Sequence, residues 1–347
     1  MATVVAWVLV FGVLIAVHEF GHFAVAKWLD MRVEEFALGF GPALWSARRG
    51  ETLYAVRAVP LGGYVRLAGM EGPGEGDRDD PRQFPNRPLW QRFCVIGAGP
   101  VMNLVLAAVL YAVVFGGLGL PEPTTVVART LPQYPAYAAG IRPGDRIVAV
   151  AGEPVHSWSA IQRAIAAHPR QPFTVTVERH GQQLVVTVHT RYDPAQRAAI
   201  IGIQPTVATV RLSPLAALGA GVQHTGELTR LWFVTLAQLV TGRGRFDVAG
   251  PVGIAVMVGQ AAQAGLTQLL LLAAALSANL GLFNILPVPV LDGSRLFLLG
   301  LEGVRRRALD PARESLIHLV GMVVLLLFVA VVTYHDITSL LVRGRAF

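Results

Sequence analysis

The sequence contains four long stretches in which apolar residues dominate and charged residues are nearly absent. They run over 1–26, where His18, Glu19 and His22 are the ionisable residues, and over 93–120, 266–291 and 316–333. The hydrocarbon core of a bilayer requires about 20 consecutive apolar residues in a helix, so each stretch is of the right size to cross a membrane. We therefore predict a polytopic α-helical membrane protein with about four transmembrane helices.

A shorter apolar stretch at 231–240 does not fit this pattern. At about ten residues it is too short to cross the bilayer core. Together with the apolar residues at 215–222, it predicts an amphipathic helical region that lies at the membrane interface or packs against the other helices.

Between the first two apolar stretches the pattern changes to short runs typical of β-strands. The runs 51–59 and 63–67 are separated by Pro60, Leu61, Gly62 and Gly63. Proline and glycine in this position indicate a turn, so we predict a membrane-associated β-hairpin or small sheet. The following residues, 70–88, are rich in Gly, Pro and charge, which predicts a mobile loop.

The region from 121 to about 206 has the pattern of a small α+β domain. We predict strands at 125–130, 146–150, 173–178 and 184–190, a turn at 142–145 and a helix at 158–168. A segment of this length can bury one compact core.

Composition and charge support a membrane protein and indicate its orientation. Hydrophobic residues make up 53% of the chain and charged residues 15%, whereas soluble domains carry about 25% charged residues. Arginines concentrate between the first two stretches and at 305–313, and the positive-inside rule places both loops in the cytoplasm. From the net charge of +7 we infer no nucleic-acid partner, and the single cysteine, Cys94, excludes a cysteine-based zinc site.

The first apolar stretch contains the run His18-Glu19-Phe20-Gly21-His22. Residues i and i+4 share one face of a helix, so the two imidazoles can bind one metal ion while Glu19 reaches a water molecule bound to it. A carboxylate at membrane depth costs at least about 2.5 kcal/mol on insertion scales, and a divalent cation would offset that cost. The alternative is a buried histidine pair in a helix core.

A catalytic zinc ion usually has three protein ligands, so a third is needed. The candidate is Asp292, at the cytoplasmic end of the third apolar stretch. His18 also lies toward the cytoplasmic end of its own helix, so the two residues are expected at similar depth. Taken alone, Asp292 can also be explained as a helix-terminal aspartate before Gly293.

These motifs resemble those of the site-2 protease family of intramembrane zinc metalloproteases, in particular the bacterial regulator of sigma-E protease type. The resemblance rests on His18-Glu19-x-x-His22 and on Asn284-x-x-Pro287-x-Pro289-x-Leu291-Asp292-Gly293. It extends over the chain through Gly39-Phe-Gly-Pro42, Pro60-Leu-Gly-Gly-Tyr-Val-Arg66, Ala98-Gly-Pro-Val-Met-Asn103 and Gly250-Pro-Val-Gly253.

The resemblance implies specific roles for these residues. His18, His22 and Asp292 would bind Zn²⁺, and Glu19 would act as general base and later as proton donor. The β segment would re-enter the membrane and offer an edge to an unwound substrate strand, and the middle domain would be a single periplasmic PDZ-like module. The candidate substrate-binding residues are Asn284, Pro287, Pro289, Gly62, Gly63 and Tyr64, whereas we interpret Asn103 as a structural residue that packs between helices.

The expected domain organisation follows from these assignments. It comprises a first transmembrane helix with the HExxH motif at 1–30, a membrane-reentrant β segment at 31–69, a flexible cytoplasmic loop at 70–91, a second transmembrane helix at 92–120, a PDZ-like periplasmic domain at 121–206, an amphipathic or interfacial helical region at 207–262, a third transmembrane helix with NxxPxPxLDG at 263–300, a cytoplasmic loop at 301–314 and a fourth transmembrane helix at 315–337.

The leading functional hypothesis is a zinc metalloendopeptidase of the bacterial inner membrane that acts in regulated intramembrane proteolysis. Its expected partners are single-span membrane proteins of the anti-sigma factor type or remnant signal peptides, a peptide or chain terminus at the PDZ-like groove, and the lipid bilayer. The alternatives are a non-catalytic membrane PDZ adaptor with a structural metal site and a metal transporter. Glu19 argues against the adaptor because a structural site would not require that carboxylate, and a transporter leaves the soluble module unexplained.

Overall fold

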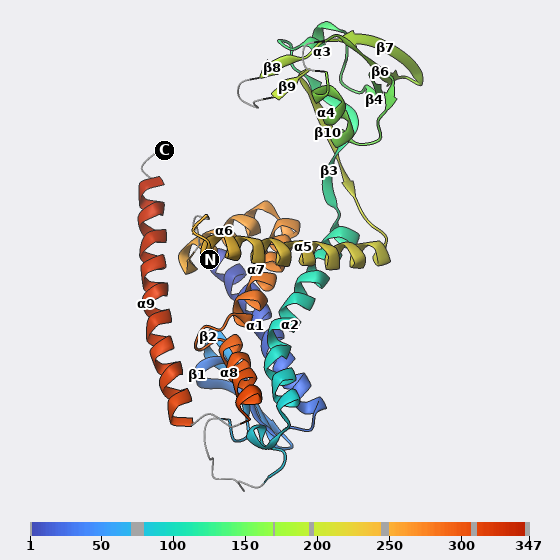
Figure 1. The fold of residues 1–347 in the computed structure, drawn as a ribbon. Coiled ribbons are helices and arrows are strands. Elements are labelled where there is room, and N and C mark those ends of the chain that lie inside the picture. Colours follow the sequence, from blue (N-terminus) through green and yellow to red (C-terminus); the bar gives the residue numbers. More distant parts are fainter. Residues whose placement is uncertain are drawn as a thin grey trace. The chain divides into compact units, whose positions relative to one another are not determined.

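The structure is a computed structural model that describes residues 2–70, 80–168, 171–193, 198–243, 250–306 and 311–343. The chain forms two compact units. Unit 1 comprises Met1–Leu118 and Leu212–Phe347, and unit 2 comprises Gly119–Arg211 (Figure 1). Residues 71–79 of the loop predicted at 70–91, and residues 307–310 of the loop predicted at 301–314, lie outside the described residues.

Unit 1 consists mainly of helices. They are α1 (Ala2–Trp28), α2 (Leu89–Val113, continued by a π-helical turn at Val114–Leu118), α5 (Pro214–Val240), α6 (Pro251–Ala264), α7 (Leu266–Ile285), α8 (Asp292–Arg305) and α9 (Pro311–Arg343). Within the described chain, four helices are long and apolar enough to cross a membrane: Thr3–Trp28, Leu89–Leu118, Leu266–Ile285 and Leu319–Ser339. The prediction of four such helices is confirmed at the level of length and composition.

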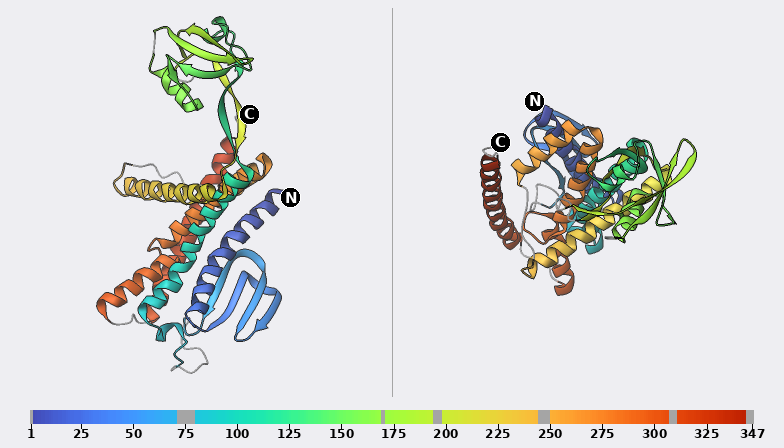
Figure 2. Two further views of the ribbon diagram at one scale, coloured as in Figure 1. Left: turned by 90° about the vertical axis from the view of Figure 1, so that its right-hand side faces the viewer. Right: turned by 90° about the horizontal axis from the view of Figure 1, so that it is seen from above.

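Helix α2 lies at the centre of unit 1 and packs against α1, α5 and α7. Figures 1 and 2 show α5 crossing the end of α2, whereas α1 and α7 run along it. The close contacts occur at glycines, where small residues let helix backbones approach. A Cβ atom on Gly21 of α1 would lie 2.6 Å from the carbonyl oxygen of Ala98, and one on Gly281 of α7 would lie 2.7 Å from that of Pro100.

The third apolar stretch does not continue as one helix. Helix α7 ends at Ile285, and α8 begins at Asp292 after a connection that contains Pro287 and Pro289. Proline lacks the backbone N–H that a helix interior needs, so the helix ends before these residues. Asp292 is then placed in the first turn of α8, where a negative charge is favoured by the helix dipole.

Helix α9 packs against α6 through a buried aspartate. Both carboxylate oxygens of Asp336 accept hydrogen bonds from backbone N–H groups at the start of α6: Oδ1 from Gly250 at 3.2 Å and Oδ2 from Gly253 at 2.7 Å. The first N–H groups of a helix have no partner within the helix, so Asp336 acts as a cap supplied by a different helix.

The predicted sheet of unit 1 is present, but its turn is elsewhere. Strands β1 (Val33–Arg49) and β2 (Thr52–Leu67) meet at a turn after Arg49, and β2 continues through the Pro60–Gly63 segment. The first part of β1 pairs with both halves of β2, for example Phe36 with Tyr54 and with Val65. Gly39 and Gly41 have positive φ angles, which allows β1 to bend where its pairing changes. The predicted separation of two strands at residues 60–63 is therefore wrong.

Unit 2 is an α+β structure with its own apolar core. Its main sheet has the strand order β10 (Ile203–Val210), β3 (Leu120–Thr130), β4 (Arg146–Val150), β6 (Phe173–Arg179) and β7 (Gln182–Val188), with β5 (Glu153–Pro154) paired to β4. Strands β8 (Arg191–Asp193) and β9 (Ala198–Ile200) pair separately, and the helices are α3 (Pro135–Ala138) and α4 (Trp158–Ala166). The four predicted strands and the predicted helix are all found; β4 has the predicted ends, and each of the other elements is shifted at one or both ends.

The core of unit 2 explains why these segments form. Ile161 and Ile165 of α4 are buried in the same apolar cluster as Val175 and Val177 of β6. Ile161 and Ile165 are four positions apart, and Val175 and Val177 are two apart, so each pair lies on one face of its element. Ser157 caps α4 by accepting a hydrogen bond from the Ala160 N–H.

Candidate metal centre

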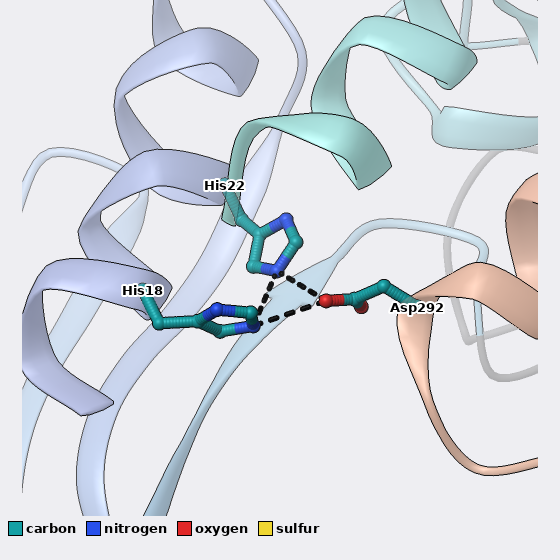
Figure 3. Close-up of side chains that lie close together, drawn as sticks. All are labelled: His18, His22 and Asp292. Atoms are coloured by element: carbon teal, nitrogen blue, oxygen red, sulfur yellow. Dashed lines mark hydrogen bonds and ion pairs between the residues drawn. The ribbon is translucent and has the colours of Figure 1, made fainter. Parts of the chain in front are cut away.

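His18, His22 and Asp292 converge at the interface of α1 and α8 (Figure 3). Both histidines are 8% exposed and lie one helical turn apart on the same face of α1. Asp292 Oδ2 lies 3.0 Å from His18 Nε2 and 3.3 Å from His22 Nε2, and the two Nε2 atoms are 3.3 Å apart. Two residues near the start of the chain and one near its end therefore form a single cluster.

The spacing of these three atoms matches what a zinc ion requires. Zinc binds imidazole nitrogen and carboxylate oxygen at about 2.0–2.2 Å in tetrahedral sites, which places neighbouring ligand atoms about 3.3 Å apart. The three observed separations of 3.0–3.3 Å agree with this value. Within the described residues, Asp292 Oδ2 is buried and receives no hydrogen bond of acceptable geometry. The residues present thus fit a zinc ion.

The ring of His22 is oriented by the backbone of α2. Its Nδ1–H donates a hydrogen bond to the carbonyl oxygen of Val95 at 2.8 Å. With the proton on Nδ1, a neutral imidazole keeps a lone pair on Nε2, the atom that faces Asp292. The backbone therefore selects the tautomer of His22 that can bind a metal ion.

The ring of His18 also contacts α2, through Asn103. The carboxamide of this residue lies 3.1 Å from His18 Nδ1, measured to Nδ2, and the residue is fully buried. The interpretation of Asn103 as a residue that only packs between helices missed this contact. The sequence contained a signal, because Asn103 is a lone polar residue in an otherwise apolar stretch.

Helix α2 also approaches both histidines closely at Gly99. A Cβ atom at this position would lie 2.3 Å from His22 Nε2 and 2.8 Å from His18 Cε1. Both separations are too short for real atoms, so the histidines fill the space that a side chain at residue 99 would need. Sequence reasoning did not assign a role to Gly99.

Glu19 lies beside the cluster and contacts the sheet. It lines the same cavity as His18, His22 and Asp292, and a Cβ atom on Gly63 of β2 would lie 2.8 Å from its Cγ. The absence of a side chain at Gly63 leaves the space that the glutamate occupies. The four residues of the predicted hydrolytic centre are therefore close together.

The cavity has a volume of about 350 Å³ and is lined by helices and by β2. Four of the predicted substrate-binding residues line it: Gly62, Gly63, Tyr64 and Asn284. Pro287 and Pro289 are not among the described residues that line this cavity. Pro289 instead contacts α9, because a Cβ atom on Gly321 would overlap it.

Tyr64 is held at the cavity by a buried acid of β1. Its hydroxyl donates a 2.8 Å hydrogen bond to Glu35 Oε1, which also accepts a hydrogen bond from Arg57. Burial raises the pKa of Glu35, but hydrogen bonds from Arg57 and Tyr64 outweigh it and leave the pKa below its usual value. Glu35 is therefore ionised at neutral pH and anchors Tyr64.

Comparison with known proteins gives matches along nearly the whole chain. A family model described as Peptidase family M50 matches residues 6–328, which include all three metal-site residues. A protein of Clostridium acetobutylicum is 36% identical over 96% of this chain and 97% of its own. The zinc metalloprotease RasP of Geobacillus kaustophilus is 31% identical over 97% of this chain and 98% of its own. The regulator of sigma-W protease RasP of Bacillus subtilis is 29% identical over 97% and 99%.

Proposed function

The chain belongs to peptidase family M50, the site-2 protease family, and is a membrane-associated zinc metalloprotease; on this premise we propose that it is an intramembrane endopeptidase that cleaves single-span membrane proteins. The observation that carries the proposal is the convergence of His18, His22 and Asp292 beside Glu19 in one cavity among apolar helices. An adaptor with a structural metal site would not need Glu19 in this position.

His18, His22 and Asp292 would hold the zinc ion through Nε2, Nε2 and Oδ2. When bound, zinc supplies Lewis acidity, which acidifies water and polarises a carbonyl oxygen. Glu19 is placed to take a proton from the attacking water on a carboxylate oxygen and to deliver it to the leaving nitrogen. Gly63 supports this role because it leaves room for the Glu19 side chain beside the ligands.

A transmembrane substrate must be unwound before its backbone can be attacked, because a helix already hydrogen-bonds its carbonyl groups. The stretch from Gly63 to Leu67 pairs with β1, and within the described chain this pairing is on one side only. Addition of a substrate strand to its other edge would give the backbone hydrogen bonds lost on unwinding. Residues 63–67 line the cavity, so the added strand would lie next to Glu19.

Asn284 is the proposed polar contact for the substrate backbone. It lies at the end of α7, one residue before the helix stops, and lines the cavity together with Asp292. A carboxamide can both donate to a carbonyl and accept from an N–H, so it suits an extended peptide.

The substrate class is proposed from the chemistry of the site and from the relatives. The relative from Bacillus subtilis is named a regulator of sigma-W protease, and we assign this chain single-span substrates of the anti-sigma factor type. We place the protein in the bacterial inner membrane with the metal centre toward the cytoplasm. Unit 2 would be an extracytoplasmic PDZ-like module that binds a peptide or chain terminus.

The test compares Glu19→Gln with the wild type on a reporter that carries one transmembrane helix. We expect cleavage to be lost in Glu19→Gln while the zinc content of the purified protein stays at the wild-type level, because the three proposed ligands are intact. Glu227→Gln is the matched control, since Glu227 is exposed on α5, where it accepts a hydrogen bond from Gln223. Undiminished cleavage by Glu19→Gln would remove this residue from the mechanism.

A further inference from the structure

We propose that Asn103 is a positioning residue that fixes His18 in the tautomer able to bind zinc, by accepting a hydrogen bond from its Nδ1–H through Oδ1. The inference rests on the proposed role of His18 as a zinc ligand. It assigns to α2 a direct part in building the metal centre, although α2 supplies none of the three ligands.

The argument begins with the proton of the His18 ring. A neutral imidazole carries its proton on one nitrogen and a lone pair on the other. His18 Nε2 faces Asp292 Oδ2 at 3.0 Å and His22 Nε2 at 3.3 Å. For Nε2 to bind a metal ion, its lone pair must be free, so the proton must sit on Nδ1.

A proton on Nδ1 then requires an acceptor, and Asn103 is positioned to provide one. Its carboxamide lies 3.1 Å from His18 Nδ1. The two ends of a carboxamide have nearly the same shape, so the hydrogen-bond network decides which end faces the ring. An NH₂ group would face the Nδ1–H donor to donor, whereas Oδ1 would accept its proton.

The other end of the carboxamide does not favour either orientation. Within the described residues, Asn103 Oδ1 is buried and has no hydrogen-bond partner. Turning the carboxamide exchanges one unpartnered end for the other, so the number of unpartnered groups is unchanged. The requirement at His18 therefore decides, and it places Oδ1 against the ring.

The backbone of Asn103 is fixed from α7. The hydroxyl of Ser277 donates a 2.8 Å hydrogen bond to the Asn103 carbonyl oxygen. The backbone of Gly281 approaches the same residue, because a Cβ atom there would lie 3.2 Å from Asn103 Cβ. The side chain is thus held between α1 and α7 with little freedom to leave His18.

The two histidines would then be oriented by equivalent means. His22 Nδ1–H donates to the Val95 carbonyl oxygen, and His18 Nδ1–H donates to Asn103 Oδ1, so both acceptors belong to α2. Groups that orient metal-binding histidines in this way typically contribute 10–100-fold to metal affinity.

The experiment measures zinc affinity of the full chain in detergent by competition with a chelator, and then cleavage of the single-helix reporter. Asn103→Leu keeps the size of the side chain and removes the acceptor, so we expect zinc affinity to fall 10–100-fold. Asn103→Asp keeps an acceptor oxygen and is expected to bind zinc within a few-fold of the wild type. A role in packing alone predicts little loss of zinc affinity in Asn103→Leu, because leucine keeps the size of the side chain.

Gly97→Ala is the matched control, because it changes α2 at a position where a Cβ atom meets no heavy atom within 4 Å and leaves the acceptor for His18 in place. It is expected to bind zinc like the wild type. The proposal is overturned if Asn103→Leu binds zinc as tightly as the wild type, or if Asn103→Asp binds as poorly as Asn103→Leu. His18→Ala separates the two proposals: unchanged zinc affinity in that variant would refute the metal centre itself.

Discussion

Replacing Gly99 by alanine is expected to disable the metal centre while leaving helix α2 intact. Gly99 lies in the interior of α2, where the backbone meets the rings of His18 and His22. Alanine is more favourable than glycine in a helix interior by about 0.8–1.0 kcal/mol. Any loss of function must therefore arise from the added methyl group and not from a weaker helix.

The size of the disturbance follows from one distance. The new Cβ would lie 2.3 Å from His22 Nε2, and real Cβ atoms essentially never approach closer than 3.0 Å. The ring of His22 and the backbone of α2 must therefore move apart by at least 0.7 Å. The ring cannot rotate away without breaking the hydrogen bond from its Nδ1–H to the carbonyl oxygen of Val95, which lies on α2 like Gly99. Distances from ligand to metal tolerate only about 0.2 Å. Misplacement of a reacting group by about 1 Å can cost 100-fold in rate, and we expect a loss of that order.

The assay is zinc content after brief exposure to a chelator, together with cleavage of the single-helix reporter. Gly97→Ala is the matched control, because Gly97 lies on the same helix and a Cβ there meets no heavy atom within 4 Å. We expect Gly97→Ala to behave like the wild type. If Gly99→Ala keeps its zinc and cleaves the reporter, the close approach of α2 to the histidines is not a constraint on the site.

The sequence predicts those features of the site that depend on spacing within one helix. His18 and His22 are four positions apart, and that spacing alone places both rings on one face of a helix. Bringing Asp292 to them required only that two apolar stretches end at the same depth in a bilayer. The structure places these three residues together.

The contributions of α2 could not be predicted in this way. Gly99 and Asn103 act through the packing of α1 against α2, and the sequence pattern of one helix does not determine where another helix contacts it. A lone asparagine in an apolar stretch indicates a polar contact with another helix, but it does not indicate which residue is contacted. Only the coordinates bring its carboxamide to within 3.1 Å of a histidine ring.

In the fold, too, elements set by their own residues could be predicted, whereas pairing between distant residues could not. In unit 2, a short apolar run after the predicted turn at 142–145 predicted β4 with the observed ends, Arg146 and Val150, and Ile147 and Val150 of this strand are buried in the core. In unit 1, Pro60 and Gly62 predict a turn, but the structure has a continuous strand there. Strand β1 pairs with β2 on both sides of this segment, and such long-range pairing has no signature in either strand alone.

Two further predictions concern one carboxylate in each unit. Asp292→Ala should lower the zinc content of the purified chain, because only the two imidazoles remain as ligands. Asp336→Ala is the control, since it removes a cap of α6 and should leave zinc bound. Full zinc content in Asp292→Ala would place the third ligand elsewhere. In unit 2, burial raises the pKa of Asp145, but hydrogen bonds from Arg179 and the Arg142 N–H outweigh it and lower the pKa below 3.8. The ionised carboxylate therefore stabilises the folded state at neutral pH, and this contribution is lost as pH falls through the lowered pKa. The urea midpoint of the wild type should exceed that of Asp145→Asn at neutral pH, and the difference should shrink as the pH is lowered below 3.8; a difference independent of pH would contradict the assignment.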